Sequence, residues 1–182
     1  MRFLSTIFLC TVALSAQADT YLIDKEGQHA YIIFKASHLG FSYIIGHFED
    51  FEGEFSYDPE DPSASSVNIT IQTASLDSDH AERDKHLRGE QYLNADDFPE
   101  IVFSSTQFVG DANSGVLTGT LDFHGVTKSV DIAVAKIGEG KDPWGGYRSG
   151  FEGTTKIAAG DYGLPGWVGD IEIDLHVEGI RQ

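Results

Sequence analysis

The amino-acid sequence predicts an all-β protein: a closed barrel or a sandwich of about eight antiparallel strands, with one short helix. Apolar and polar residues alternate with a period of two along most of the chain, as in strands that have one buried and one solvated face. Clusters rich in Gly, Pro, Asn and Asp separate these runs, as turns between antiparallel strands do.

The first 18 residues have the features of a secretory signal peptide. Arg2 gives a positive start, residues 3–14 are mostly apolar, and Ala16-Gln17-Ala18 is a small-x-small cleavage site. We therefore expect export, cleavage after Ala18 and a single domain over residues 19–182; the alternative is a buried N-terminal helix or strand. Because Cys10 would leave with the signal peptide, the mature chain would depend on its core and not on disulfides.

The charge balance is strongly acidic, with 12 Lys and Arg against 29 Asp and Glu, for a net charge of −17. Such a surface repels nucleic acid and anionic lipid headgroups, so we expect neither as a partner. No apolar run after residue 18 approaches the roughly 20 residues that a membrane-spanning helix needs. A soluble protein that does not span the membrane is therefore expected.

Six alternating runs predict the clearest strands, and one polar segment predicts the helix. The runs cover residues 30–36, 51–57, 67–72, 116–123, 130–134 and 171–177. The segment Ser78 to Asn94 is rich in charged residues and His and contains no β-branched residue. We expect a short helix there, capped by Ser78 or Asp79 and ending before Phe98-Pro99.

The interior of an eight-stranded barrel is either filled by side chains or just wide enough for one ligand. Aromatic residues dominate the inward positions here, and Gly53, Gly119 and Gly153 lie between them. Glycine at an inward position leaves space that a side chain would fill, which predicts an elongated apolar tunnel. The alternative is that these glycines mark bulges or corners of the barrel.

Four blocks of sequence, in order and spread over essentially the whole mature chain, resemble the YceI-like family. They are residues 21–48, residues 83–87 with 98–105, residues 119–128, and residues 161–170. The resemblance implies an extended lipocalin-like antiparallel barrel in the periplasm. It also implies a tunnel for a non-covalently held polyisoprenoid, such as a prenyl quinone or an isoprenyl phosphate, or for a fatty-acid-like molecule. A homodimer is a further expectation from the family, and no other cofactor is expected.

Two positions depart from the family pattern. Ala30 replaces the Ser that usually follows His29, and Ala159 stands where the family often has an Arg. Without that Arg, we expect a neutral headgroup such as a quinone or a fatty acyl amide in preference to a pyrophosphate.

Inward periodicity and the family blocks together give the candidate ligand-binding residues. They are Phe34, Ala36, His38, Phe48, Phe51, Gly53, Phe55, Ile69, Ile71, Arg83, His86, Leu87, Phe103, Gly119, Leu121, Phe123, Phe151 and Tyr162.

Three of these candidates are polar, and each has two interpretations. His38 follows the inward periodicity of its strand, so it is either a polar anchor for the ligand or a hydrogen-bonded core histidine. Arg83 and His86 lie one helical turn apart and would meet a ligand carbonyl or phosphate. The alternative is that Arg83 pairs with Asp161 or Asp77 and ties the helix to the barrel rim.

Neither a catalytic nor a metal site is expected. The seven histidines lack the spacing of a zinc site, and no nucleophile elbow, phosphate-binding loop or catalytic cysteine is present in the sequence. A lipid-binding protein is therefore favoured over a prenyl-lipid hydrolase, which would need convergent carboxylates or a metal. A further alternative is a stress-related interaction module with a packed core.

Overall fold

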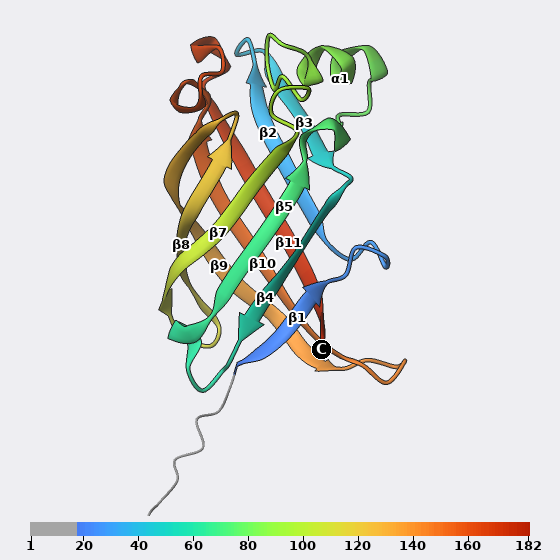
Figure 1. Ribbon diagram of the computed structural model, residues 1–182, viewed down its shortest axis with the longest axis vertical. Helices are drawn as coiled ribbons and strands as arrows, with labels where there is room; N and C mark the ends of the chain where they lie inside the picture. The colour runs from blue at the N-terminus through green and yellow to red at the C-terminus, as the bar shows by residue number, and fades with distance from the viewer. Residues whose placement is uncertain (1–17) are drawn as a thin grey trace, which may run out of the picture.

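The computed structural model describes residues 18–182, so all but the last residue of the expected signal peptide lies outside the described residues. Eleven strands and one α-helix follow one another along this part of the chain (Figure 1). The strands are β1 (Asp19–Ile23), β2 (Tyr31–His38), β3 (Ser42–Phe48), β4 (Phe51–Tyr57), β5 (Ser66–Gln72), β6 (Leu76–Asp77), β7 (Glu100–Gly110), β8 (Ser114–Phe123), β9 (Val126–Lys141), β10 (Tyr147–Ala158) and β11 (Asp170–Arg181). The helix α1 spans Ala81–Arg88.

The strands form a closed antiparallel barrel with eight positions around its wall. Eight strands pair in the order β1-β4-β5-β7-β8-β9-β10-β11, and β1 also pairs with β11, which closes the ring. The remaining three lengthen the wall: β2 pairs with β11 beyond β1, β3 pairs with β2, and β6 pairs with β3. Three of the eight barrel strands are thus interrupted, and the predicted barrel of about eight strands with one helix is confirmed.

The three interruptions lie side by side across the wall. The amide of Gln72 donates to the carbonyl of Asp50 at 2.8 Å, and that of Glu49 donates to Ser75 at 3.1 Å. On the other side, the amide of Thr73 donates to the carbonyl of Pro99 at 2.8 Å. Because these backbone groups remain paired, the wall stays continuous where its strands break.

Buried charges hold the first interruption, between β1 and β2. The carboxylate of Asp24, only 5% exposed, accepts hydrogen bonds from the guanidinium of Arg148 on β10 and from the amide of Gly27. Arg148 also donates to Asp142 at 2.9 Å and pairs with Glu178 on β11. Burial alone would raise the pKa of Asp24, but hydrogen bonds from Arg148, His29 and Gly27 outweigh it and lower the pKa from 3.8 to about 2.

Helix α1 is shorter than predicted and begins at a different cap. The ring Nδ1 of His80 accepts a hydrogen bond from the amide of Arg83 at 3.2 Å, so His80 is the N-cap, not Ser78 or Asp79. Ser78 instead bonds through its amide and hydroxyl to the carboxylate of Asp84, and Asp79 adopts a left-handed turn with φ of 62°. Within residues 18–182, no helix is both long and apolar enough to cross a membrane.

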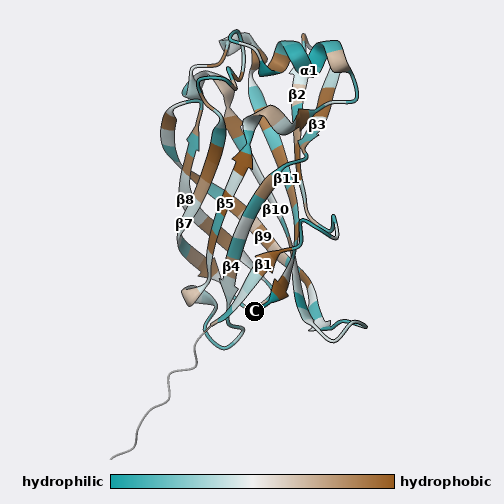
Figure 2. Ribbon diagram, turned by 45° about the vertical axis from the view of Figure 1, so that its right-hand side comes forward, coloured by the Kyte–Doolittle hydropathy of each residue, from teal (hydrophilic) through white to brown (hydrophobic). Residues whose placement is uncertain are grey.

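Aromatic rings lie close against three glycines of the barrel wall. A Cβ atom on Gly119 would lie 2.4 Å from the Phe103 ring, and one on Gly179 would lie 2.4 Å from the Phe55 ring. Gly46 receives the ring of Phe34 in the same way. Glycine therefore allows large side chains to pack against the backbone of a nearby strand. The alternation of hydropathy along the strands is visible in Figure 2.

Replacing Asp24 by Asn should remove one specific part of the acid sensitivity of the fold. Because the pKa of Asp24 is lower in the folded chain, its contribution is complete above about pH 4 and lost as pH falls towards 2. The shift corresponds to about 2 kcal/mol of unfolding free energy. Urea unfolding between pH 2 and 7 should show a flatter profile for Asp24→Asn than for the wild type. Equal slopes would contradict the role of this carboxylate.

Adding a methyl group to the wall should be costly at Gly119 and nearly neutral at Gly153. The Cβ of Gly119→Ala would lie 2.6 Å from the backbone oxygen of Ser104, whereas the nearest atom to a Cβ on Gly153 is Cγ2 of Ile132, at 3.1 Å. We expect Gly119→Ala to lose about 2 kcal/mol in urea unfolding and Gly153→Ala to change by less than about 1 kcal/mol. Similar values for the two variants would refute this packing.

Candidate ligand-binding tunnel

The barrel encloses a cavity of about 260 Å³, to which every strand and α1 contribute lining residues. The cavity runs along the barrel. Tyr92 and Val168 line it at the end that carries α1, and Asn113 and Lys136 line it at the end that carries the β7–β8 turn. Apart from the second end, the lining is almost entirely hydrocarbon. An elongated apolar tunnel is therefore present, as the periodicity indicated.

Eleven of the eighteen candidate residues line this tunnel. They are Phe34, Ala36, Phe48, Phe55, Ile69, Ile71, Leu87, Phe103, Leu121, Phe123 and Phe151. Each lies on the inward face that strand periodicity gave it, except Leu87, which reaches the tunnel from α1.

Two aromatic candidates are buried outside the tunnel lining, and one polar candidate is exposed. Phe51 belongs to the core, and Tyr162 packs against Phe123 with ring centroids 5.3 Å apart. His38 is exposed at the end of β2, where the chain turns back into β3. The interpretation of His38 as a core histidine is therefore wrong, and His38 does not line the tunnel; its role as a polar anchor stays a prediction.

Two of the three glycine positions were also misassigned. Gly119 pairs with Ser105 beside a β-bulge at Thr106, and the Phe103 ring occupies the space above Gly119. Side chains of Ile23 and Ile69 cover Gly53 in the same way. Gly153 alone of the three lines the tunnel. The space expected at Gly53 and Gly119 is filled, because a position without a side chain lets neighbouring side chains pack over the backbone.

Arg83 and His86 do not line the tunnel. The guanidinium of Arg83 donates to the hydroxyl of Ser78 at 2.7 Å and to the Ser78 carbonyl, so it braces the segment before α1. Neither of its predicted partners, Asp161 and Asp77, is involved, and the contacts of Arg83 are with Ser78. His86 lies 3.1 Å from the side-chain oxygen of Gln91 and packs edge-on against Tyr92.

Two lining residues were missed in the sequence: Phe108, which a β-bulge turns inward, and Lys136, which follows strict alternation. In β7, the bulge at Thr106 shifts the inward face from odd to even positions, so that Phe108 lines the tunnel together with Ile101 and Phe103. In β9, Lys136 follows Val134 on the inward face, just before the register shift opposite Gly150 and Phe151. The inward run at even positions of β9 was visible in the sequence and could have been extended to Lys136.

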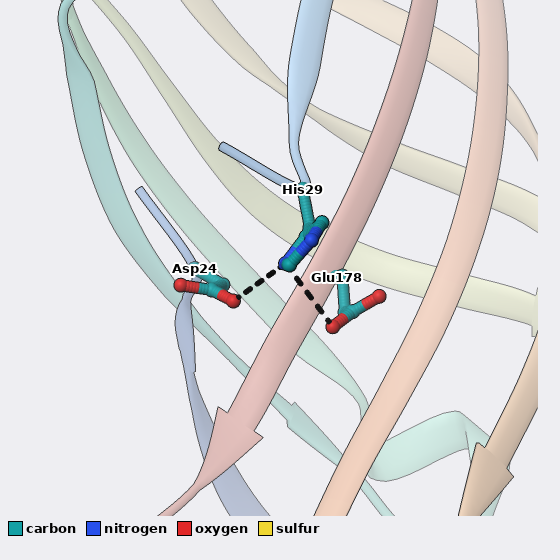
Figure 3. Close-up of side chains that lie close together, drawn as sticks. All are labelled: Asp24, His29 and Glu178. Carbon is teal, nitrogen blue, oxygen red and sulfur yellow. Dashed lines mark hydrogen bonds and ion pairs between the residues drawn. The ribbon is translucent and has the colours of Figure 1, made fainter. Parts of the chain in front are cut away.

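A cluster outside the barrel, formed by Asp24, His29 and Glu178, has donor atoms close enough to hold a metal ion (Figure 3). Nδ1 of His29 lies 3.0 Å from Asp24 Oδ2 and 3.8 Å from Glu178 Oε1. The guanidinium of Arg148 already pairs with these same two oxygens. Since a metal ion would have to displace this cation, we interpret the cluster as a structural ion network.

Comparison with known proteins finds similar sequences and similar folds. A UPF0312 protein of Shewanella putrefaciens is 50% identical over 175 residues, covering 93% of this chain and 91% of the relative. A UPF0312 protein of Shewanella baltica matches with the same identity and coverage.

Solved structures share the fold at lower identity. A YCEI protein of Campylobacter jejuni is 27% identical with a TM-score of 0.73, covering 80% of this chain and 90% of its own. BcnA of Burkholderia cenocepacia gives a TM-score of 0.76 at 19% identity, over 86% and 98% of the two chains. A polyisoprenoid binding domain from Saccharophagus degradans gives 0.66 at 14% identity, over 91% and 100%.

The family model described as the YceI-like domain matches residues 21–179, which is almost all of the part that the structure describes. Strand order, barrel closure and sequence agree with this match, and the chain belongs to the YceI-like family.

Proposed function

We propose that this protein binds one long apolar lipid of the polyisoprenoid type in its tunnel and carries it in the periplasm. The observation that carries the proposal is the hydrocarbon-lined tunnel enclosed by the barrel. The Saccharophagus degradans domain described as polyisoprenoid binding has the same fold, which supports this class of ligand. The signal-peptide features of residues 1–18 support the periplasmic location, and a homodimer stays a prediction.

Apolar burial provides enough free energy for such binding. Each buried methylene-sized unit contributes about 0.8 kcal/mol, so a chain of several isoprene units gains far more than the entropic cost of ordering it. The inward residues of β5 and β11 that line the tunnel are aliphatic, as a flexible hydrocarbon tail would require. The tunnel also disfavours the alternative of an interaction module with a packed core.

The acidic residues of the lining favour a binding protein over a hydrolase. These residues are Asp111 and Glu152. The carboxylate of Asp111 accepts hydrogen bonds from the amides of Asn113 at 2.7 Å and Ser114 at 3.0 Å. This residue therefore shapes the β7–β8 turn, whereas a hydrolase would need carboxylates that converge on a substrate.

Organic extraction of the purified protein, followed by mass spectrometry, tests the proposal directly. We expect close to one prenyl or acyl lipid per chain, with native mass spectrometry giving the same stoichiometry. A protein that carries no lipid and rejects added prenyl quinones and prenyl phosphates would overturn the proposal.

A side chain built into the tunnel should displace the lipid. Gly153 lines the tunnel, and a Cβ there needs only a small shift of the Ile132 side chain, 3.1 Å away, so the ring of Gly153→Phe would project into the lumen. We expect at least about a tenfold loss of lipid per folded chain, equivalent to roughly 1.4 kcal/mol. Thr154→Phe is the matched control, because Thr154 is the next residue and is exposed on the opposite face of β10. Unchanged lipid content in folded Gly153→Phe would place the ligand elsewhere.

A further inference from the structure

The two ends of the tunnel differ in chemistry. Leu87, Leu93 and Val168 line the end at α1, whereas Ser65, Asn113 and Lys136 line the opposite end. The polar end is built by the corner between β4 and β5, the β7–β8 turn and the bulged part of β9. Hydrogen bonds link these segments: the Lys136 amide donates to Asn113, and the Tyr57 hydroxyl donates to the carbonyl of Ala112, both at 2.8 Å.

The ammonium group of Lys136 places a positive charge at this end and is largely shielded from solvent. Its side chain is 13% exposed, and its ammonium lies 2.9 Å from Glu139, donates to the Tyr57 hydroxyl at 3.2 Å and sits over the Tyr57 ring. Burial alone would lower the pKa of Lys136, but hydrogen bonds to Glu139 and Tyr57 outweigh it and raise that pKa, so the group stays charged. An ammonium has three donors, and these two acceptors leave one for a ligand.

A second donor at this end has no acceptor within the described residues. The hydroxyl of Ser65 is buried, lines the tunnel and has no hydrogen-bond partner among residues 18–182. An unsatisfied buried hydroxyl costs about 1–3 kcal/mol. A ligand acceptor placed here would remove that cost, so the orphan hydroxyl points to a polar group of the ligand.

The charges at this end select the kind of acceptor. Glu139 neutralises Lys136, while Asp111 adds a negative charge at this end of the lining. An anionic phosphate would meet net repulsion here, whereas a carbonyl oxygen would accept hydrogen bonds without bringing a charge.

We propose that the Lys136 end of the tunnel is a headgroup subsite, where Lys136 and Ser65 donate hydrogen bonds to a neutral carbonyl-bearing headgroup while the tail extends towards α1. This inference rests on the proposed function, since it assumes that a lipid tail occupies the tunnel. It assigns the class of ligand as a prenyl quinone, amide or ester in preference to a prenyl phosphate.

Affinities for three ligands of equal chain length test the subsite: a prenyl quinone, a prenyl hydrocarbon and a prenyl diphosphate. The wild type should bind the quinone most tightly. Lys136→Met and Ser65→Ala should each weaken quinone binding more than hydrocarbon binding, by about tenfold more for Lys136→Met. Lys156→Met is the matched control, because Lys156 is exposed and pairs with Asp170 and Glu172 on the outer surface.

The outcomes separate the subsite from the proposed function. Hydrocarbon binding with no preference for the quinone, or with the same quinone affinity in every variant, would overturn the subsite and keep the tunnel. Tighter binding of the diphosphate than of the quinone would also overturn it. Failure of all three ligands to bind the wild type would overturn the proposed function and the subsite together.

The orientation of the ligand can be measured without altering the subsite. The two tryptophans lie at opposite ends of the barrel: Trp144 in the turn between β9 and β10, and Trp167 beside Tyr92 near α1. A prenyl chain ending in a nitroxide, itself a neutral acceptor, should broaden the indole N–H signal of Trp144 more than that of Trp167 in NMR spectra. Stronger broadening of Trp167 would place the headgroup at α1 and overturn the proposal.

Discussion

The tunnel depends on closure of the barrel by β1, a strand of only five residues. Four residues of β1 pair with β4 and three pair with β11, and without β1 the ring would be an open sheet. Tyr21 is 2% exposed and stacks on Phe55 with ring centroids 4.9 Å apart. The Asp24–Arg148 pair then fixes the end of β1 to β10. A strand too short to hold by backbone hydrogen bonds alone is thus secured by one buried ring and one buried ion pair.

The closed wall remains hollow because its large side chains lie along the wall and not across the lumen. Phe34 and Phe103 each cover a glycine of the neighbouring strand, at Gly46 and Gly119, and Phe55 of β4 reaches across β1 to cover Gly179 of β11. A ring that lies against backbone fills the groove between strands and leaves the axis free. The aromatic residues and these glycines therefore depend on each other: the missing side chain of the glycine leaves space for the ring, and the ring shields the glycine backbone.

Periodicity predicted the barrel and most of the tunnel, because a residue's face follows directly from its position along a regular strand. It failed wherever the strand is irregular: the bulge at Thr106 turns Phe108 inward, and Gly119 lies opposite that bulge. His38 was misplaced because β2 reaches the rim, where inward periodicity no longer implies burial. The contacts of Arg83 with Ser78 depend on the turn before α1, which adopts a left-handed conformation at Asp79 that propensity did not predict.

Selectivity in such a protein has to arise at the ends of the tunnel. Apolar burial is non-directional, so the walls can measure the length and width of a tail but cannot distinguish one headgroup from another. Recognition of a headgroup requires directional hydrogen bonds, and a donor left without an acceptor in a dry site costs free energy. The buried hydroxyl of Ser65 and the shielded ammonium of Lys136 meet that description at one end. At the other end, Ala159 is fully buried and uncharged, so an anionic headgroup would gain no cation from that position.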